Sequence, residues 1–460
     1  MKKLIAILLA VLMVCSLFVG CAKEETAAPE VEAETETPAV ESEESIKDKY
    51  GFDKLDLVCF NGGNVGMWDE MVELFLEFYP GVEVTTDFSD DVANRIRARM
   101  MTDNPPDIVS SSGSEWSSLE AAKAGQLMDL TEFFTTGNNA DGVPMSEVVT
   151  EAALSYSYVG DQLIAAPFGN IYTGWWYNAA MFEELGITPP TNWDELYAAA
   201  EVLKANDIIP FMYQYPSYGC WGLSYLLMTA AGGIDTFNKC YITLDEGAWL
   251  SDEALAAITL QENLVKDGIL SPLSVGADFS ASQVDFINGR VAMLPCGTWF
   301  ENEMKDVTPE GFQMTFIPFP AVEEGGNRVV IVSSDGDINI PAHCLNPEAA
   351  KAFIGVMLSE KGQTIVAKYG RMPISQAMDL SVLNDVMTVA NLSALEAAQQ
   401  DDVVIIPSTE SYYGDLSTAL RNSNDELCLG DITAEEYCQA MEETAEMIRN
   451  DPEVEIMTVH

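Results

Sequence analysis

Apolar and polar residues alternate between strand-like and helix-like patterns from about residue 55 onward. An apolar run at 55–60 predicts a buried strand, and large apolar residues at 68–79 then recur at the spacing of one helix face. A strand at 82–86, a helix rich in Arg and a short strand at 107–110 follow. This β-α-β-α-β order predicts a parallel sheet, and the loops after the carboxyl ends of such strands are the usual ligand positions.

A second segment of mixed pattern begins after residue 169. Its predicted elements are, in order, a strand at 173–177, a helix capped by Thr191 or Asn192, a strand at 208–212, and helices near 222–231 and 253–266. Residues 347–450 are predicted to be almost wholly helical. A chain of 460 residues with two α/β segments is expected to fold as two lobes.

Composition narrows the possible partners. The chain has 22 Lys and Arg against 73 Asp and Glu, a net charge of −51, which disfavours nucleic acid and anionic lipid as ligands. An acidic surface of this kind usually serves solubility. The nine Cys form no CxxC pair and only two His occur, so a zinc site is disfavoured and no cofactor is expected. Cys428 and Cys438 form a local disulfide or serve as buried apolar residues; the sequence leaves both open.

The N-terminus reads as a targeting segment. Lys2 and Lys3 precede an apolar run at 4–19, and FVGC at 18–21 resembles a bacterial lipobox, in which Cys21 would carry the lipid. Phe18 departs from the usual Leu, and the alternative is a plain secretory signal with an incidental Cys. Residues 1–20 are therefore expected to be a lipoprotein signal peptide. Residues 21–49, rich in Glu, Ala, Pro and Thr, are expected to be a disordered acidic tether.

Four further segments carry a family resemblance when taken in chain order. They are NPPDIV at 104–109 with LEAAKAGQLMDL at 119–130; GDQLIAAPFG at 160–169 with WYNAAMFEELGI at 176–187 and PTNWDEL at 190–196; FINGRVAMLPCGTW at 286–299; and NPEAAKAFI at 346–354. Each is weak alone. Together they resemble the extracellular solute-binding proteins of carbohydrate ABC importers, the group that includes maltodextrin-binding proteins.

The resemblance implies a two-lobe, type II periplasmic-binding-protein-like α/β fold with discontinuous lobes joined by a hinge. The first lobe would comprise residues 50–165 plus 295–335, and the second 166–294 plus 336–460. The chain would cross between lobes near 166–169, 294–297 and 334–338. A monomer would capture a sugar between the lobes and deliver it to the permease of an ABC importer, while the lipid on Cys21 holds it at the outer face of a bacterial membrane.

Sugar binding needs aromatic rings for the C–H faces and polar groups for the hydroxyls. Trp299, at a helix start after a predicted strand, is the strongest candidate, because the family pattern has a cleft Trp there; the alternative is a core Trp. The full set of candidates at strand ends, crossings and loops is Asn61, Asp87, Ser112, Trp116, Asn170, Tyr172, Trp175, Tyr215, Trp221, Trp299, Asp335, Gly336, Arg371 and Tyr413. An ion pair is the alternative for Arg371, and Trp68, Trp193 and Trp249 are predicted to be packing residues.

Other functions remain as alternatives. No GxSxG, Walker or HExxH motif occurs, and a binding protein needs no catalytic residue, so an enzyme is not expected. The main alternative is a surface lipoprotein acting on polysaccharide through two facing carboxylates. A binder of a non-sugar solute, such as a peptide or polyol phosphate, and an adhesin without a small ligand are the others.

Overall fold

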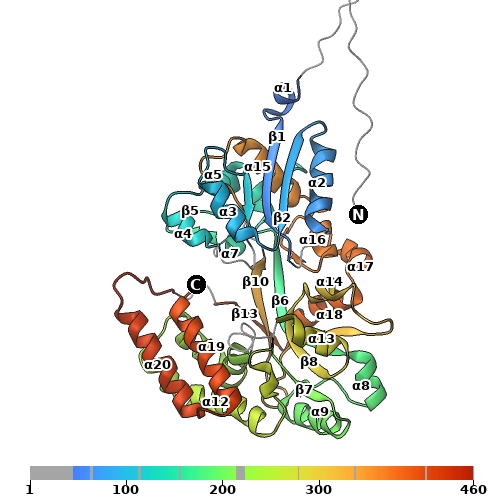
Figure 1. Cartoon of the computed structure of the whole chain (residues 1–460), viewed down its shortest axis with the longest axis vertical. Helices are drawn as coiled ribbons and strands as arrows, with labels where there is room; N and C mark the ends of the chain where they lie inside the picture. The colour runs from blue at the N-terminus through green and yellow to red at the C-terminus, as the bar shows by residue number, and fades with distance from the viewer. Residues whose placement is uncertain are drawn as a thin grey trace, which may run out of the picture. The chain divides into compact units, whose positions relative to one another are not determined.

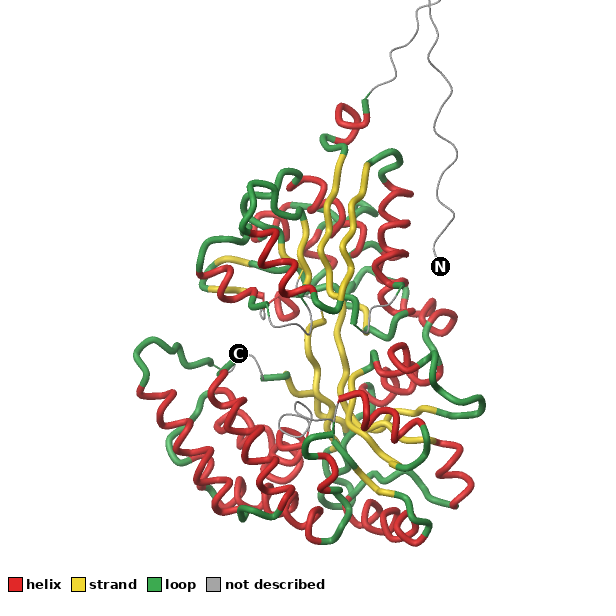
Figure 2. The backbone as a smooth tube through the Cα atoms, in the orientation of Figure 1, coloured by secondary structure: helices red, strands yellow, loops and turns green. Residues whose placement is uncertain are grey.

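The structure is a computed structural model that describes residues 45–62, 66–111, 116–154, 157–213, 223–277, 279–335, 338–409 and 412–458. Residues 1–44, with the expected signal peptide, Cys21 and most of the expected tether, lie outside this part of the chain. The described residues are organised around two β-sheets with helices packed against each, which we call the first and second lobes (Figures 1 and 2). The predicted α/β fold is confirmed.

The first lobe contains a four-stranded sheet in the order β11-β3-β1-β2, with β1, β2 and β3 parallel and β11 antiparallel to β3. Its strands are β1 (Lys54–Phe60), β2 (Glu83–Ser89), β3 (Ile108–Ser110) and β11 (Ile338–Asn339), with a separate hairpin of β4 (Tyr158–Val159) and β5 (Gln162–Leu163). Its helices are α1 (Ile46–Tyr50), α2 (Met67–Phe78), α3 (Val92–Met100), α4 (Ser118–Lys123), α5 (Thr131–Thr136), α6 (Met145–Val148), α7 (Glu151–Leu154), α15 (Pro347–Met357) and α16 (Glu360–Lys368). The predicted β-α-β-α-β order is the observed β1-α2-β2-α3-β3.

Apolar faces of α2 and α15 fill the core of this lobe. Trp68 is 1% exposed, as predicted for a packing residue, and its indole N–H donates to the carbonyl of Phe60 at 2.8 Å. Phe75 and Phe353 meet with ring centroids 5.6 Å apart. The helix spacing read from the sequence therefore identifies the buried face of α2.

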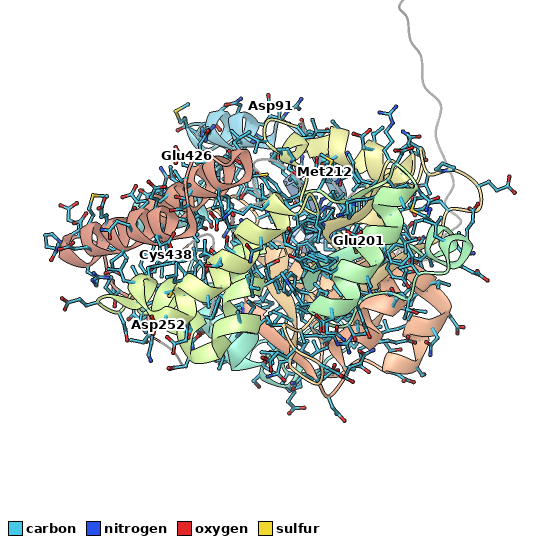
Figure 3. All side chains as sticks on the ribbon, turned by 90° about the horizontal axis from the view of Figure 1, so that it is seen from below. Asp91, Glu201, Met212, Asp252, Glu426 and Cys438 are labelled. Carbon is cyan, nitrogen blue, oxygen red and sulfur yellow. The ribbon has the colours of Figure 1, made fainter. Side chains whose placement is uncertain are left out.

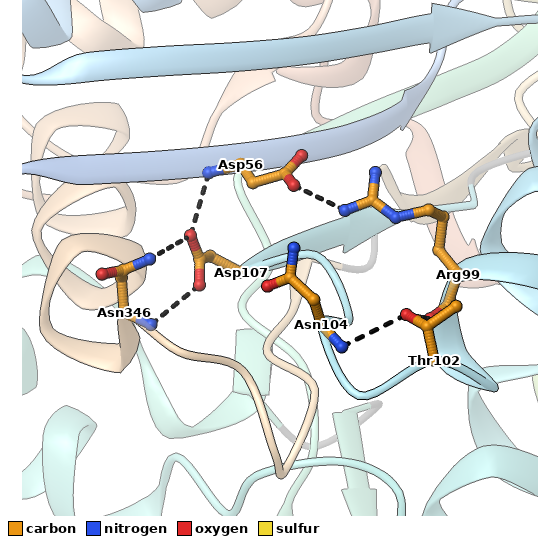
Figure 4. A network of polar contacts seen from close by, with 6 residues as sticks. All are labelled: Asp56, Arg99, Thr102, Asn104, Asp107 and Asn346. Atoms are coloured by element: carbon orange, nitrogen blue, oxygen red, sulfur yellow. Dashed lines mark hydrogen bonds and ion pairs between the residues drawn. The ribbon is translucent and has the colours of Figure 1, made fainter.

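Asp107 joins three elements at the amino ends of the first-lobe strands (Figure 4). Its carboxylate accepts from the backbone N–H of Asp56 at 2.9 Å and from the backbone and side chain of Asn346 at 2.8 and 3.1 Å. Arg99 forms an ion pair with Asp56 at 2.5 Å. Burial raises the pKa of Asp107, although its hydrogen bonds with Asn346 and Asp56 oppose the rise. Asp107 of the NPPDIV segment thus has a structural role, at the edge opposite the carboxyl strand ends.

The second lobe contains a seven-stranded sheet with the path β13-β10-β6-β8-β7, to which β9 and β12 add by pairing with β6. Its strands are β6 (Gly169–Asn178), β7 (Ile209–Phe211), β8 (Val291–Gly297), β9 (Met314–Ile317), β10 (Arg328–Asp335), β12 (Met372–Pro373) and β13 (Val403–Pro407). Figure 3 shows the molecule from below, with Glu201, Asp252 and Glu426 labelled on three of the helices of this lobe.

The helices of the second lobe fall into three types. The α-helices are α8 (Ala179–Leu185), α9 (Trp193–Ala205), α10 (Ser224–Leu227), α11 (Gly233–Phe237), α12 (Asp252–Lys266), α13 (Phe279–Ile287), α14 (Phe300–Met304), α17 (Leu383–Val386), α18 (Val389–Ala398), α19 (Gly414–Leu429) and α20 (Ala434–Asn450). Two π-helices, η3 (Met228–Gly232) and η4 (Asn238–Ile242), and three 3₁₀ turns, η5 (Ala248–Leu250), η6 (Pro272–Ser274) and η7 (Leu380–Val382), complete the described set. Of the two predicted caps, Asn192 accepts from the N–H of Glu195 at 3.0 Å and begins α9.

The lobe boundaries differ from those predicted. The chain crosses between the sheets at Phe168–Gly169, between β10 and β11, and between the end of α16 and the start of α17. The predicted crossing at 294–297 is wrong, because β8 leads into α14, whose Phe300 packs in the second lobe, and then into β9 and β10 beside β6. Residues 295–335 therefore belong to the second lobe. Residues 338–368 belong to the first lobe. The sequence had predicted 295–335 in the first lobe and 338–368 in the second.

Two further predictions need correction. Residues 45–49, assigned to the tether, begin with a helix: Ser45 caps α1, and Ile46 and Tyr50, one turn apart, pack against the first-lobe core. The region 347–450 is not wholly helical, because β13 pairs in parallel with β10. Its β-branched run Val403 to Ile406, closed by Pro407, carried the strand signal that the helical periodicity around it concealed.

Cys428 and Cys438 do not form the local disulfide that the sequence left open. Cys59, Cys240, Cys344, Cys428 and Cys438 are free thiols, and all but the half-buried Cys344 are buried. Burial raises the pKa of all five, to about 11 for Cys428 and about 12 for Cys344 and Cys438. Cys428 and Cys438 thus act as apolar packing residues rather than as a disulfide.

Candidate functional site

The carboxyl ends of the main strands define one edge in each sheet. In the first lobe the parallel β1, β2 and β3 end together. In the second lobe β7 is parallel to β8, β13 is parallel to β10, and β8 and β10 are both antiparallel to β6. Consequently β7, β8, β10 and β13 all end at one edge, which we call the ligand edge because such edges hold ligands in open α/β sheets.

The crossings join the two carboxyl edges to each other. β10 ends at Asp335, and β11 begins three residues later with Ile338, which pairs with Ser110 at the carboxyl end of β3. Ala166 forms a bridge with Ile338, and Gly169 at the start of β6 pairs with Asp335. Both sheets therefore direct their carboxyl ends toward the crossing strands, where loops from both lobes can reach one bound molecule.

Trp299 lies at this edge, directly after β8. Its side chain is half-buried and packs against two cores of the second lobe. Its ring covers Gly297, where a Cβ atom would lie only 2.1 Å from the ring. Gly297 pairs with Thr173 of β6, so the indole packs against the end of the sheet. The absence of a side chain at Gly297 is what allows this close approach.

Three buried hydroxyl groups lie near the same edge. Thr173 on β6, Thr298 after β8 and Thr409 after β13 are 1%, 0% and 3% exposed. Among the described residues none of the three hydroxyl oxygens has a hydrogen-bond partner. A buried hydroxyl without a partner is costly, and each can donate or accept. The sequence analysis missed all three, since Thr has no distinctive pattern at strand ends.

Two carboxylates lie within α14, the helix that follows Trp299. Glu301 accepts from the hydroxyl of Thr388, and Glu303 accepts from the side-chain amide of Gln283 at 2.9 Å. Burial raises the pKa of both carboxyl groups; hydrogen bonds oppose this, as does the charge of Arg371 near Glu303. Their position in α14 was not predicted from the sequence.

Five predicted site residues lie at or near the carboxyl edges. Asn61 follows β1 and donates its backbone N–H to Ser89 at 3.3 Å, and the half-buried Trp116 packs between two small first-lobe clusters. Asn170 and Tyr172 lie at the start of β6, both half-buried. Burial raises the pKa of Tyr172. Asp87 lies two residues before the end of β2.

The carboxylate of Asp87 is already engaged. It forms an ion pair with Arg95 of α3 at 2.5 Å. A ligand hydroxyl would have to share this carboxylate with the guanidinium. Asp87 is thus a weaker candidate than its strand-end position suggested.

Three predictions of ligand-facing side chains are corrected by burial. Trp175 is 0% exposed in the second-lobe core, with its ring 4.4 Å from that of Phe211. Tyr413 is 4% exposed, and its hydroxyl donates to the carbonyl of Ile242 at 2.6 Å. Arg371 is 2% exposed and donates to the carbonyl of Tyr369 at 2.8 Å. These side chains are core or hinge residues.

The remaining predicted residues cannot be placed. Ser112, Tyr215, Trp221 and Gly336 lie outside the described residues, as does the side chain of Asp335. The backbone of Asp335 is at the end of β10, on the ligand edge.

The described residues show neither a metal-binding cluster nor a membrane-spanning helix. No group of three or more His, Cys, Asp or Glu side chains in this part of the chain is placed to hold a metal ion. No helix within the same residues has both the length and the apolar character required to cross a bilayer.

Comparisons with known proteins agree on one family. The sequence model of the family described as "Bacterial extracellular solute-binding protein" matches residues 65–364. A diacetylchitobiose binding protein of Streptomyces coelicolor is 25% identical over 378 residues, 80% of this chain and 79% of the relative. A multiple sugar-binding protein of Streptococcus mutans is 24% identical over 289 residues, 61% of this chain and 65% of the relative, just under two thirds of its length.

Solved structures share the fold. A chitin oligosaccharide binding protein superposes with a TM-score of 0.67 at 21% identity, covering 86% of this chain and 98% of that one. A maltose-bound MalE3 of T. maritima gives 0.66 at 19% identity, with 86% and 99% covered. The predicted two-lobe architecture is confirmed by these likenesses.

Proposed function

The chain belongs to the family of bacterial extracellular solute-binding proteins, and from this premise we propose that it captures a sugar or short oligosaccharide between its two lobes. The observation that carries the proposal is Trp299, a half-buried indole held against the ligand edge by its close approach to Gly297. A flat aromatic ring offers a sugar the apolar surface that its C–H face requires.

The polar groups near Trp299 support an uncharged ligand. The half-buried side chains of Asn170 and Tyr172, at the start of β6 on this edge, can hydrogen-bond to sugar hydroxyls without placing a charge beside them. The carboxylates of Glu301 and Glu303 in α14 and the net charge of −51 disfavour an anionic solute. The printed names of relatives, a diacetylchitobiose binder and a multiple sugar binder, point in the same direction.

Binding would need no chemical step. The two lobes are connected by three chain crossings, and a hinge at these positions would let the carboxyl edges close around the sugar. Closure would remove Trp299 from water and surround the ligand with groups from both lobes. The liganded form would then deliver the sugar to the permease of an ABC importer.

We also propose that the protein is held at the outer face of a bacterial membrane by a lipid on Cys21. The support is in the sequence alone: a basic start, an apolar run at 4–19 and FVGC at 18–21. An acidic tether before α1 would extend by charge repulsion and keep the lobes clear of the anchor.

Mass spectrometry of the natively purified protein tests the proposed function. We expect a co-purified neutral sugar, and calorimetric binding of the same compound to the stripped protein. Intact sugar after prolonged incubation identifies a binding protein, whereas cleavage products would identify a glycoside-active enzyme. A bound peptide or phosphate ester would refute the sugar assignment while keeping the solute-binding family.

A further inference from the structure

The segment that follows α20, residues 451–458, returns to the second-lobe core; we call it the strap. The backbone N–H of Met457 donates to the hydroxyl of Tyr413 at 2.8 Å. Ile456 is half-buried and packs against the core, whereas the other strap residues are exposed. The backbone N–H of Tyr412 donates to the carbonyl of Thr409, two residues beyond the end of β13, at 3.0 Å, so the chain turns at that strand end just before Tyr413.

The position of Tyr413 places the strap at the ligand edge. Tyr413 caps α19, six residues after Pro407 ends β13, one of the four strands that form this edge. Its side chain is 4% exposed, and its hydroxyl also donates to Ile242 at 2.6 Å. One buried hydroxyl therefore binds both Ile242 and the strap, and it belongs to the residue that begins α19 after β13.

The distance along the edge can be judged from the strand order. Trp299 follows β8, and the sheet path from β8 to β13 passes through β6 and β10. Three strand spacings of about 4.8 Å give about 14 Å between the Trp299 side and the strap side. A linear oligosaccharide stacked on Trp299 and extending along the edge toward β13 would meet the strap after a few sugar units.

We propose that the strap is the end wall of the ligand site on the β13 side and limits the length of the oligosaccharide accepted. The inference rests on the proposed function and adds a length limit to it. The strap lies beyond residue 364, the last residue that the family model matches. The hydrogen bond of Met457 and the apolar side chain of Ile456 are among the contacts that hold this wall on the core.

The experiment compares the full chain with a chain ending at Asn450. Calorimetric affinities are measured for a ladder of neutral oligosaccharides of the co-purified sugar, from disaccharide to octasaccharide. The full chain should lose affinity beyond a limiting length. For each chain, the affinity for the longest oligosaccharides is divided by the affinity for the best short one. This ratio should be about tenfold or more higher in the shortened chain than in the full chain, the discrimination expected from relieving a steric misfit.

Two point variants keep the test independent of the truncation. Tyr413→Phe keeps the buried ring and removes the hydroxyl that holds Met457, so it should shift the length profile in the same direction. Tyr197→Phe is the matched control. Tyr197 lies on α9, outside the ligand edge, and its hydroxyl donates to Asp267 at 2.8 Å, so this substitution should leave the length profile unchanged.

The outcomes separate the two proposals. If no sugar binds either chain, the proposed function fails. If both chains bind sugars with the same dependence on length, even with different melting temperatures, the strap is only a packing element and the inference is overturned.

Discussion

The side chain of Trp299 both packs against the second lobe and offers an accessible surface for a ligand. Part of its indole packs on Gly297 and two cores, and the rest remains accessible at the ligand edge. A ring fixed in this way loses little conformational freedom when a ligand stacks on it, and this fixed orientation makes it an efficient binding surface.

We expect Trp299→Ala to reduce the affinity for the co-purified sugar by about 2 kcal/mol or more, the range of an interface hot spot. The substitution removes the aromatic surface and leaves space that water fills. Calorimetry and thermal unfolding on one preparation check this. Trp193→Ala, at an 8% exposed packing residue in α9, is the control that should lower stability without changing affinity. A Trp299 variant with unchanged affinity and a sharply lower melting temperature would make the residue structural.

Glu70 of α2 provides a pH-dependent contact at the other lobe. Its carboxylate pairs with Lys368 at 2.6 Å and accepts from the hydroxyl of Tyr369 at 2.7 Å. Burial raises the pKa of Glu70, but these hydrogen bonds and the charges of Lys368 and of Lys305 on α14 outweigh it, so the net shift is downward.

A lowered pKa in the folded state means that this stabilisation is present above the unfolded pKa, about 4.3, and is lost as the pH falls through the folded value. Glu70→Gln should therefore reduce the free energy of unfolding by about 0.5–1 kcal/mol at pH 7, with the deficit vanishing in acid. Urea unfolding across this pH range measures it. Glu77→Gln on the same helix, whose partner Lys361 is more exposed, should show a smaller deficit; an equal, pH-independent loss in both would contradict the assignment.

Residue positions were predicted better than residue environments. Trp68, Trp193 and Trp249 were predicted to pack, and all three are buried. The sequence favoured Trp299 over Trp175 through the family pattern, but it kept both as candidates because both stand at a predicted strand or its end. What separates them is burial by Phe211 and Phe319, side chains far away in the chain.

At the scale of elements, the short connection after α16 brings the lobes into direct contact. Gly370 adopts a φ of +80°, and a Cβ there would lie 2.5 Å from the carbonyl oxygen of Thr298, next to Trp299. Only glycine permits both this backbone conformation and this approach. The crossing between α16 and α17 is thus packed directly behind the candidate binding residue.

Gly370→Ala should destabilise the protein more than a positive φ alone would. Strain at such a position costs about 1–2 kcal/mol, and displacement of Thr298 adds to it. Gly186→Ala is the matched control: its φ is +67°, but no atom lies within 4 Å of the added Cβ. Chemical denaturation of the two variants compares the costs, and equal losses would mean that the Thr298 contact yields without cost.

Element types followed from periodicity, whereas element partners did not. The predicted β1-α2-β2-α3-β3 order was correct because each strand and helix has a clear local pattern. β13 was missed, since five residues between two helices give a weak signal until β10 pairs with them. The lobe assignment of β8 to β10 failed for the same reason: strand pairing is a long-range property.

At the scale of the whole molecule, the crossings make relative movement of the lobes easier than rearrangement of either core. Each lobe has its own buried cluster, and the connecting strands β6 and β10 pair with each other. Bending at the crossings would therefore preserve most of the packing within each lobe.

We expect saturating ligand to reduce the radius of gyration. The reason is that a ligand contacting both carboxyl edges stabilises the closed arrangement over the open one. Small-angle scattering with and without the co-purified sugar measures the change. Trp299→Ala at the same ligand concentration should give an intermediate or open profile, and identical curves for the free and saturated wild type would argue against hinge closure.

Cys21→Ala should release the protein from membranes without altering its solute affinity, because the proposed tether would separate the proposed anchor from the lobes. Detergent-phase partitioning and calorimetry check the two parts. Cys59→Ala, within β1, is a control that keeps the N-terminal segment intact. Partitioning of the wild type into the aqueous phase would refute the lipid anchor.

The buried thiols become reactive when the core around them unfolds, so alkylation of each cysteine reports local unfolding of its lobe. Alkylating reagents react quickly only with thiolates. In the folded protein, burial raises the pKa of the thiols of Cys59, Cys240, Cys428 and Cys438 and shields them from solvent, so they stay protonated and unreactive. Cys59 belongs to the first-lobe core, and the other three belong to the second. The order in which these sites acquire label, read by peptide mass, therefore reports which lobe unfolds first and whether bound sugar slows one lobe or both.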